Sequence, residues 1–348
     1  MRALVKPAPA PGAEMRSVPV PDLGPRDVLV RVRIASICGT DLHIYEWDEW
    51  SQRRLRPPLV FGHEFCGVVE KIGAEVEAVR PGDAVSAEMH LACGRCQQCR
   101  TGNAHVCRSL RILGVDADGC FAEFVRVPES NIWKLDPAIP PEYGAILDPL
   151  GNAVHTVLAG PIAARSVAVV GCGPIGLMGI AVCRAAGAGE IFALEINASR
   201  RALALRMGAD HALDPRQQDA VAEIAGHTLG GGADVVLEFS GHADGIRTAF
   251  ALACPGARVS LLGLPAAPLE LDLGNQVILK GLTVQGIHGR RMFETWYQMQ
   301  AMLRGGKLNL DPLFTDRLPL SAFAAAMEKL RQGEAAKVLL FPDGQPPA

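Results

Sequence analysis

The chain has 348 residues, of which 49% are hydrophobic and 20% charged, a balance that excludes a disordered or fibrous protein and favours two or three compact domains. A formal net charge of −3 gives no basic patch of the kind that nucleic acid or an anionic membrane requires, so we expect neither partner. We find no apolar run of about 18 residues and no signal-peptide pattern at the start, which favours a cytoplasmic protein.

The first 150 residues show the pattern of short strands separated by turns. Residues 27–37, DVLVRVRIASI, alternate apolar and polar side chains as a half-buried strand does. Further along, Val68, Val69 and Ile72 lie among glycines and are followed by a Pro81–Gly82 turn. We therefore expect residues 1–150 to form an irregular β-rich domain of short strands.

Four of the ten cysteines lie between residues 93 and 107, with the spacing C-x2-C-x2-C-x7-C. In a reducing compartment this density indicates a metal site rather than disulfides. An iron–sulfur cluster is the competing interpretation, but the bacterial ferredoxin spacing ends in C-x3-C-P, which this loop lacks. Four thiolates complete a tetrahedral shell with no open position, so we expect a structural zinc site. Its ligands would be Cys93, Cys96, Cys99 and Cys107.

The pattern changes after Ser166. Residues 166–195 contain an apolar strand, a glycine turn, an apolar helix and a second strand, which together indicate a βαβ unit. Further strands are expected at 233–241, 257–264 and 282–289, with helices such as 200–207 and 244–253 between strands. Alternating strands and helices predict a parallel, doubly wound sheet over residues 151–289. Residues 290–348 begin as helices and end in KVLLF (337–341), a strand that we expect to rejoin the first domain.

A G-x-G-x-x-G pattern, formed by Gly171, Gly173 and Gly176, follows the first strand of this sheet and opens its helix. This pattern is a dinucleotide fingerprint because a strand precedes it, a helix follows it and an acidic residue ends the next strand. The pyrophosphate is then expected at the amino terminus of the helix. That acid is Glu195, which suits ribose hydroxyls and repels a 2′-phosphate, so the sequence favours NAD over NADP. Arg200 either contacts the adenine ribose or is a solvated cation at a helix start.

Three segments of the first domain each offer residues that bind metals: Cys38 in CGTDLH, His63 and Glu64 in FGHEF, and Asp148 in LDPLG. One thiolate, one imidazole and one or two carboxylates match a catalytic zinc site, which keeps a position open. Taken singly, these residues have ordinary structural explanations. A histidine after a glycine is more often a structural residue than a ligand, and an aspartate before a proline commonly starts a turn.

The segments around these residues resemble those of a known enzyme family. GHEFCGVVEKIGAEV (62–76) resembles the signature of the zinc-containing alcohol dehydrogenases, and the cysteine loop and nucleotide glycines follow in the order of the medium-chain dehydrogenase/reductase family. The resemblance extends over essentially the whole chain. It implies an α/β fold in which a GroES-like β-rich catalytic domain is joined to a Rossmann doubly wound nucleotide-binding domain, assembled as a homotetramer. It also implies two zinc ions per subunit, with the catalytic ion held by Cys38, His63 and Glu64.

The same resemblance assigns a proton relay to Thr40 and His43. Asp148 departs from the wider family, where a cysteine often supplies the third ligand. Direct coordination, coordination through water and exchange with Glu64 during turnover all stay open for this residue. The resemblance implies NAD contacts at Gly171, Gly173, Ile175, Gly176, Glu195, Arg200, Leu262, Gly263, Leu264, Gly286 and Ile287.

Residues 37–50 and 286–296 are similar to the branch of the family that acts on L-threonine, which implies its oxidation by NAD⁺ to L-2-amino-3-oxobutanoate. His90, Arg290 and Arg291 are candidates for lining the pocket or meeting the nucleotide phosphates. The nearest alternative is the same chemistry on a polyol or another secondary alcohol, such as sorbitol or butanediol, because a fold does not fix its substrate pocket. A catalytically silent nucleotide-binding protein is the alternative from another functional class.

Overall fold

The computed structural model describes residues 1–344, and the chain forms two compact units. Unit 1 contains Met1–Pro149, Arg291–Trp296 and the residues from Phe314 onward, and unit 2 contains Leu150–Arg290 and Tyr297–Leu313. Residues 297–313 thus group with unit 2, whereas 314–344 group with unit 1. Within residues 1–344, none of the helices combines the length and apolar character needed to span a bilayer.

Unit 1 is the β-rich unit that the sequence predicts. Its strands are β1 (Arg2–Lys6), β2 (Glu14–Ser17), β3 (Asp27–Ser36), β4 (Leu59–Val60), β5 (Glu64–Ile72), β6 (Ala84–Ala87), β7 (His90–Leu91), β8 (Arg111–Ile112), β9 (Phe124–Pro128), β10 (Ile132–Lys134), β17 (Phe314–Pro319) and β18 (Lys337–Phe341). The main sheet has the order β10-β6-β5-β3-β18-β17, and β9 also pairs with β3. Strands β2-β1-β4 and β7-β8 form two smaller sheets.

The helical segments of unit 1 are short. They are α1 (Gly39–Glu46), α2 (Glu49–Arg54), α3 (Gln97–Arg100), η1 (Ala104–Val106), η2 (Glu129–Asn131), α4 (Pro141–Ala145), η5 (Leu320–Ala322) and α11 (Phe323–Arg331). The boundary between the units runs through α5 (Leu147–Leu158) and α10 (Glu294–Arg304).

Strand β5 differs from the short strands expected near Val68, because it continues for nine residues through Gly67. A side chain at Gly67 would place its Cβ 2.2 Å from the Arg31 carbonyl oxygen, so glycine allows β5 to lie close against β3. Gly67 therefore allows β5 and β3 to pack closely and does not mark the end of a strand.

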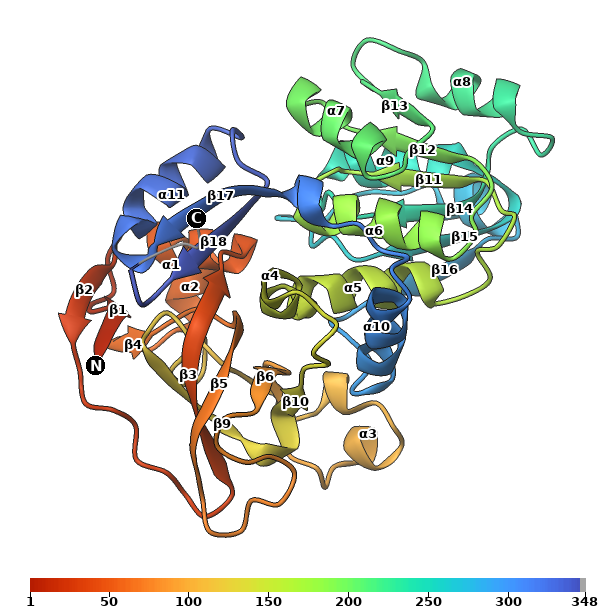
Figure 1. Cartoon of the computed structure of the whole chain (residues 1–348). Helices are drawn as coiled ribbons and strands as arrows, with labels where there is room; N and C mark the ends of the chain where they lie inside the picture. The colour runs from red at the N-terminus through yellow and green to blue at the C-terminus, as the bar shows by residue number, and fades with distance from the viewer. Residues whose placement is uncertain (345–348) are drawn as a thin grey trace. The chain divides into compact units, whose positions relative to one another are not determined.

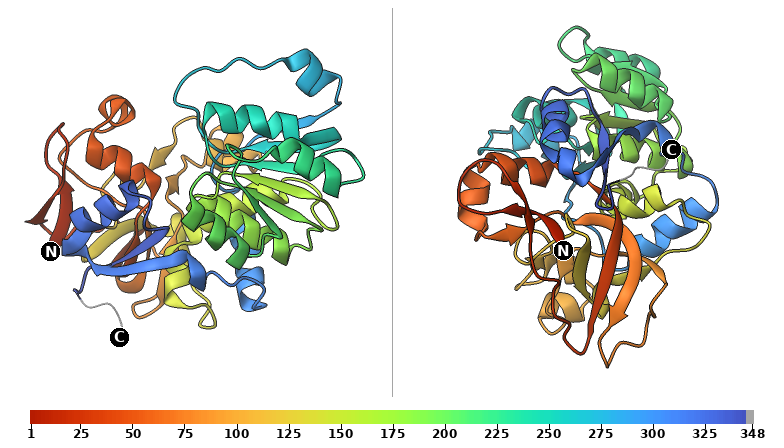
Figure 2. Two further views of the ribbon diagram at one scale, coloured as in Figure 1. Left: turned by 90° about the horizontal axis from the view of Figure 1, so that it is seen from above. Right: turned by 60° about the vertical axis from the view of Figure 1, so that its left-hand side comes forward.

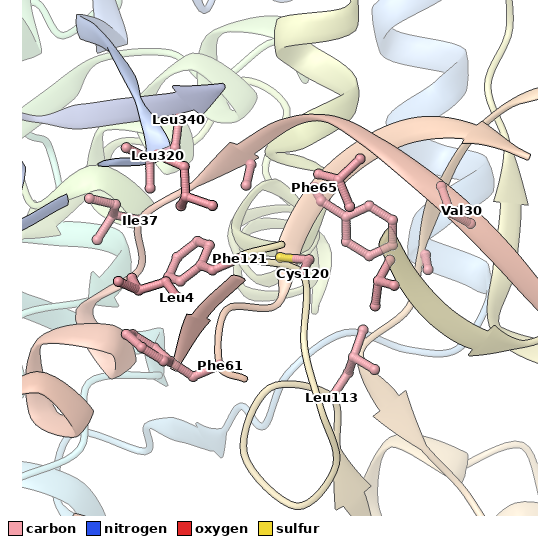
Figure 3. Close-up of a cluster of buried hydrophobic side chains, with 14 of the residues drawn as sticks. Leu4, Val30, Ile37, Phe61, Phe65, Leu113, Cys120, Phe121, Leu320 and Leu340 are labelled. Carbon is pink, nitrogen blue, oxygen red and sulfur yellow. The ribbon is translucent and has the colours of Figure 1, made fainter. Parts of the chain in front are cut away.

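The late strand KVLLF belongs to the first unit. β18 pairs antiparallel with β3, with Leu339 opposite Ser36 and Leu340 opposite Ala35 (Figure 1). Leu320 and Leu340 enter the same buried cluster as Leu4 and Phe61 (Figure 3). Each buried apolar side chain of this size contributes about 1.5–3 kcal/mol, so both ends of the chain stabilise one core.

Unit 2 contains the predicted parallel sheet. Its elements are β11 (Val167–Val170), α6 (Pro174–Ala185), β12 (Ile191–Leu194), α7 (Ala198–Arg206), β13 (His211–Leu213), α8 (Ala220–His227), β14 (Ala233–Glu238), α9 (Ala243–Leu252), β15 (Ala253–Leu261), the π-helix η3 (Gly274–Ile278), β16 (Thr283–Gly286) and η4 (Asp311–Leu313). The strand order is β13-β12-β11-β14-β15-β16, with every pair parallel. Helices α6 and α7 cover one face and α8 and α9 the other (Figure 2).

This order is that of the Rossmann fold, so the sequence-based fold class is confirmed. It reverses direction between β11 and β14, where connections leave on opposite sides. Ligands of such sheets bind outside the carboxyl ends of the strands at this point. The glycine pattern follows β11 directly and therefore lies there.

Candidate active site

Cys38, His63 and Glu64 come together in unit 1. Cys38 is the residue before α1, just after β3, while His63 and Glu64 lie where β5 begins. Gly62 turns the chain into β5 with a φ of +88°, and a Cβ there would lie 2.5 Å from the Phe121 ring. One possible ligand atom from each of Cys38, His63 and Glu64 lies within 4.8 Å of the other two. This trio could hold a metal ion.

The surroundings of this trio favour a positive charge. His63 is 1% exposed, and burial alone would lower its pKa, but the neighbouring Cys38, Asp41 and Asp148 outweigh burial and raise the pKa to about 10. Burial raises the pKa of Asp41 to about 6, although His63 opposes that shift. Acidic groups therefore dominate around the trio.

Several buried polar atoms of the trio and its surroundings have no hydrogen-bond partner within the described part of the chain. They are His63 Nδ1, Glu64 Oε1 and Asp41 Oδ1. Buried polar atoms are nearly always paired, so such atoms beside a thiol indicate a place for a cation. The donor set of sulfur, nitrogen and oxygen suits zinc.

Glu64 is held from the side by Lys337 of β18. The Lys337 ammonium forms an ion pair with Glu64 Oε2 and donates a hydrogen bond to the Ile37 carbonyl oxygen at 2.8 Å. Ser36 also donates to Glu64 Oε2, at 2.5 Å. One carboxylate oxygen is thus occupied, and the other is left for the trio.

Asp148 lies in the first turn of α5 and is buried. Its charge acts on His63 and on the thiol of Cys120, which places it near the trio. Asp148 does not belong to the set of ligand atoms within 4.8 Å.

The proposed relay residues lie on α1. Thr40 Oγ1 is 3.8 Å from Cys38 Sγ, and His43 follows Thr40 by three residues, so the two share a helix face. His43 Nδ1 is 2.5 Å from Asp48 Oδ2, and its side chain is 57% exposed. Partial burial would raise the pKa of Asp48, but hydrogen bonds from the Ser51 amide and from His43 lower it, so Asp48 stays ionised.

The four cysteines of the 93–107 loop also come together, each with a sulfur within 4.8 Å of the other three. Cys96 Sγ lies 3.5 Å from Cys99 Sγ and 3.8 Å from Cys107 Sγ. Zinc–sulfur bonds of about 2.3 Å in a tetrahedron give sulfur–sulfur distances of about 3.8 Å. Amide groups of Cys99 and Arg108 lower the pKa of Cys96 to about 6, which favours the thiolate.

The glycine loop of unit 2 borders a cavity of about 550 Å³. Gly171 has a φ of +87°, and a Cβ on Gly176 would lie 2.0 Å from the Gly171 carbonyl oxygen. A Cβ on Gly173 would meet no atom within 4 Å. Gly171 and Gly176 are therefore needed for the turn, whereas Gly173 leaves open space at the start of α6.

Glu195 and Arg200 line the same cavity. Glu195 Oε2 accepts a hydrogen bond from the Cys172 amide, and Oε1 accepts one from the Asn197 amide, both at 2.9 Å. These bonds fix a negative charge beside the glycine loop. Arg216, which the sequence did not single out, lines the cavity as well.

The remaining predicted nucleotide contacts lie at the same edge of the sheet but outside the lining of this cavity. Residues 262–264 follow β15, and Gly286 ends β16. The Leu262 amide donates to the Glu238 carbonyl oxygen at 3.0 Å, and the Ile287 amide donates to the Leu261 carbonyl oxygen at 2.8 Å. Ile175 and Gly176 are in the first turn of α6.

The candidate substrate residues have different surroundings. His90 is buried, with Nδ1 2.8 Å from Glu88 Oε1, and Glu88 Oε2 accepts from the Trp296 ring at 2.8 Å. Arg290 is fully buried and contacts Asn152 Oδ1 at 3.2 Å, whereas Arg291 is an exposed partner of Glu294. Arg290 can be buried because Gly151 leaves space for its side chain, and the role of both arginines at the substrate or the nucleotide stays a prediction.

Sequence reasoning missed Lys337, Asp41 and Asp48. A lysine within the apolar run KVLLF was a visible signal, because a buried lysine needs a partner. Asp41 and Asp48 lie three and ten residues after Cys38, in a segment already singled out.

The chain is similar to known dehydrogenases over nearly its full length. Residues 24–137 match the family model of the alcohol dehydrogenase GroES-like domain, and residues 174–304 match that of zinc-binding dehydrogenases. The L-threonine 3-dehydrogenase of Symbiobacterium thermophilum is 53% identical over 99% of this chain and 98% of its own length. That of Bacillus licheniformis is 48% identical over 98% of this chain and 99% of its own. A zinc-binding dehydrogenase from Sinorhizobium meliloti 1021, crystallised with NADP, has a TM-score of 0.90 and 31% identity, covering 98% of this chain and 99% of that structure.

Proposed function

This chain belongs to the zinc-containing alcohol dehydrogenases of the medium-chain dehydrogenase/reductase family, and on that premise we propose that it is an L-threonine 3-dehydrogenase. It would convert L-threonine and NAD⁺ to L-2-amino-3-oxobutanoate, NADH and a proton. The carbon that carries the hydroxyl gives up a hydride to the nicotinamide, and the hydroxyl gives up its proton. Relatives named for this activity match nearly the full chain at 46–53% identity.

The observation that carries the proposal is the trio Cys38, His63 and Glu64, in which buried polar atoms of His63 and Glu64 have no hydrogen-bond partner within the described part of the chain. These residues would hold the catalytic zinc, with Asp148 as a nearby carboxylate. When bound, such an ion supplies Lewis acidity, which brings a hydroxyl proton within reach of loss near neutral pH. Lys337 and Ser36 keep Glu64 turned so that Oε1 faces the trio.

Residues of α1 provide a path for the proton. The Thr40 hydroxyl, beside Cys38, can accept the proton of the substrate hydroxyl and pass its own to His43. Asp48 orients the His43 ring through Nδ1, which leaves Nε2 for the transfer. Because His43 is more than half exposed, it can release the proton to solvent.

Glu195 supports NAD over NADP as the cofactor. Both of its oxygens are fixed by backbone amides beside the glycine loop, where a ribose would lie and a 2′-phosphate would be repelled. Replacing Glu195 by glutamine should raise the NADP⁺ to NAD⁺ ratio of kcat/KM. An unchanged ratio would contradict this role.

The second zinc would be structural and held by the four-cysteine loop, whose sulfur distances fit a single tetrahedral ion. Two zinc ions per chain is therefore part of the proposal. The proposal also includes assembly as a homotetramer in the cytoplasm. The tetramer rests on the resemblance, and a reducing compartment accords with ten cysteines that form no disulfide.

The test is steady-state kinetics of the zinc-loaded protein with NAD⁺ and L-threonine, sorbitol, 2,3-butanediol or ethanol. We expect kcat/KM to be highest for L-threonine. A higher value for a polyol would keep the family and overturn the substrate. Absence of turnover with every substrate, despite bound zinc and NAD, would indicate a nucleotide-binding protein instead.

A further inference from the structure

Unit 2 contains a second cluster of metal-binding side chains that the dehydrogenase chemistry does not use. Glu190 lies just before β12, His211 begins β13 and His227 ends α8. One ligand atom from each lies within 4.8 Å of the other two. Glu190 Oε1 is 2.6 Å from His211 Nε2 and 3.1 Å from His227 Nδ1.

This cluster is separate from the nucleotide site. Glu190 and His211 stand at the amino ends of parallel strands, with His211 in register with Phe192. Gly171 and Glu195 follow the carboxyl ends of β11 and β12. The two sites therefore occupy opposite edges of the same sheet, and any ligand of the cluster is distinct from the dinucleotide.

The surroundings orient both histidines. The Phe192 ring stacks on His211 with 4.8 Å between centroids and 13° between planes. His227 turns Nδ1 towards Glu190, while its Nε2 lies 3.7 Å from Glu223 Oε1, one helical turn earlier. A histidine that binds a metal through one ring nitrogen usually directs the other at a carboxylate or carbonyl. Glu223 supplies that arrangement.

Charge and access also favour a cation. Glu190 and Glu223 contribute two carboxylates, and the neighbouring Arg184 is already paired with Asp210 at 2.6 Å. The side chains of Glu190, His211 and His227 are 34%, 28% and 38% exposed, so an ion can reach them from solvent. Two imidazoles and a carboxylate are a donor set for zinc and its neighbours, and solvent can complete the shell.

We propose that Glu190, His211 and His227 form a third metal site, which binds a zinc-class divalent cation and ties the end of α8 to the edge of the parallel sheet. Without a metal, the same residues form two hydrogen bonds through one shared carboxylate oxygen. With a metal, the three elements share one ion. This proposal does not depend on the proposed activity.

The experiment measures zinc bound to the full-length protein after dialysis against buffered micromolar free Zn²⁺. Wild type is compared with His227→Ala and Glu190→Gln, and Glu328→Gln on α11 is the matched control, since it removes an exposed carboxylate elsewhere. NAD binding by each variant verifies that unit 2 is folded. The Glu190→Gln change preserves side-chain size and serves if the histidine variant does not fold.

We expect both site variants to retain about one zinc ion less per chain than wild type, and the control to match wild type. Titration with Zn²⁺ should give an affinity at least about tenfold weaker for this last ion in Glu190→Gln. Hydrogen exchange of α8 should slow on zinc addition in wild type and in the control alone. Equal zinc content in all four proteins would overturn the proposal and leave the cluster as a hydrogen-bonded group. The difference in zinc content between wild type and the site variants depends only on this cluster, so it tests the proposal whether or not L-threonine is oxidised.

Discussion

Two alanine substitutions in the glycine loop separate packing from nucleotide binding. At Gly173 the backbone has φ −65° and ψ 179°, which alanine adopts freely, and the added Cβ meets no atom within 4 Å. Alanine is a poorer residue than glycine before a helix, but it lowers the entropy of the unfolded chain. These effects offset each other, so Gly173→Ala should change the free energy of unfolding by less than about 1 kcal/mol.

At Gly176 the same substitution should destabilise the fold. Its Cβ would lie 2.0 Å from the Gly171 carbonyl oxygen, a backbone atom that no side-chain rotation can remove. Overpacking of this kind costs up to about 3 kcal/mol, and the better helix propensity of alanine returns about 1 kcal/mol. We therefore expect Gly176→Ala to lower the free energy of unfolding by about 2 kcal/mol.

NAD affinity should respond mainly to the substitution at Gly173. The methyl group at Gly173 occupies the space through which a pyrophosphate approaches the start of α6, so Gly173→Ala should weaken NAD binding at least about tenfold, or about 1.4 kcal/mol. Denaturant unfolding measures the stability of both variants, and calorimetric titration measures their affinity for NAD. A stable Gly173→Ala variant with wild-type affinity would refute the assigned nucleotide path, and a Gly176→Ala variant as stable as wild type would refute the packing argument.

Three further substitutions test other parts of the structure. Lys337→Met leaves Glu64 as a buried carboxylate without its cation, so we expect a loss of about 3–5 kcal/mol in denaturant unfolding at fixed metal loading, and a loss below 1 kcal/mol would contradict the pairing. Hydrogen bonds from Arg216 hold the pKa of Asp214 below its ordinary value, so the ionised form stabilises the fold above that value and this contribution disappears as the pH falls through the lowered pKa. Asp214→Asn should therefore reduce stability at neutral pH and flatten its decline in acid, as urea unfolding from pH 3 to 7 would measure; parallel curves for the two proteins would argue against it. Cys96→Ser should lower the zinc content by about one ion and expose residues 93–107 to proteolysis, whereas unchanged zinc would exclude the four-cysteine site.

Local pattern was sufficient to predict the parallel sheet and the nucleotide loop. The strand before Gly171, the helix after it and Glu195 at the end of the next strand all lie within 30 residues. The apolar run at residues 337–341 likewise indicated a strand.

Contacts between distant residues were not predictable in this way. Lys337 and Glu64 are 273 residues apart, and Trp296 reaches Glu88 across 208 residues. No periodicity records such pairs, and their energetic weight comes from burial that exists only in the folded chain. Arg290 illustrates the same limit, since its burial depends on the space left by Gly151. The role of Asp148 in catalysis stays a prediction, as do the relay and the nucleotide contacts.

The central claim is that the trio of Cys38, His63 and Glu64 carries zinc-dependent oxidation of L-threonine. Its most direct test is the rate of NADH formation from L-threonine and NAD⁺ by the zinc-loaded protein beside its Cys38→Ser variant, with NAD binding measured in both. The account predicts turnover in wild type, loss of at least about a hundredfold in the variant and unchanged NAD affinity, because transition-state stabilisation by the ion is lost while the cavity of unit 2 is intact. Turnover by Cys38→Ser at the wild-type rate would contradict it.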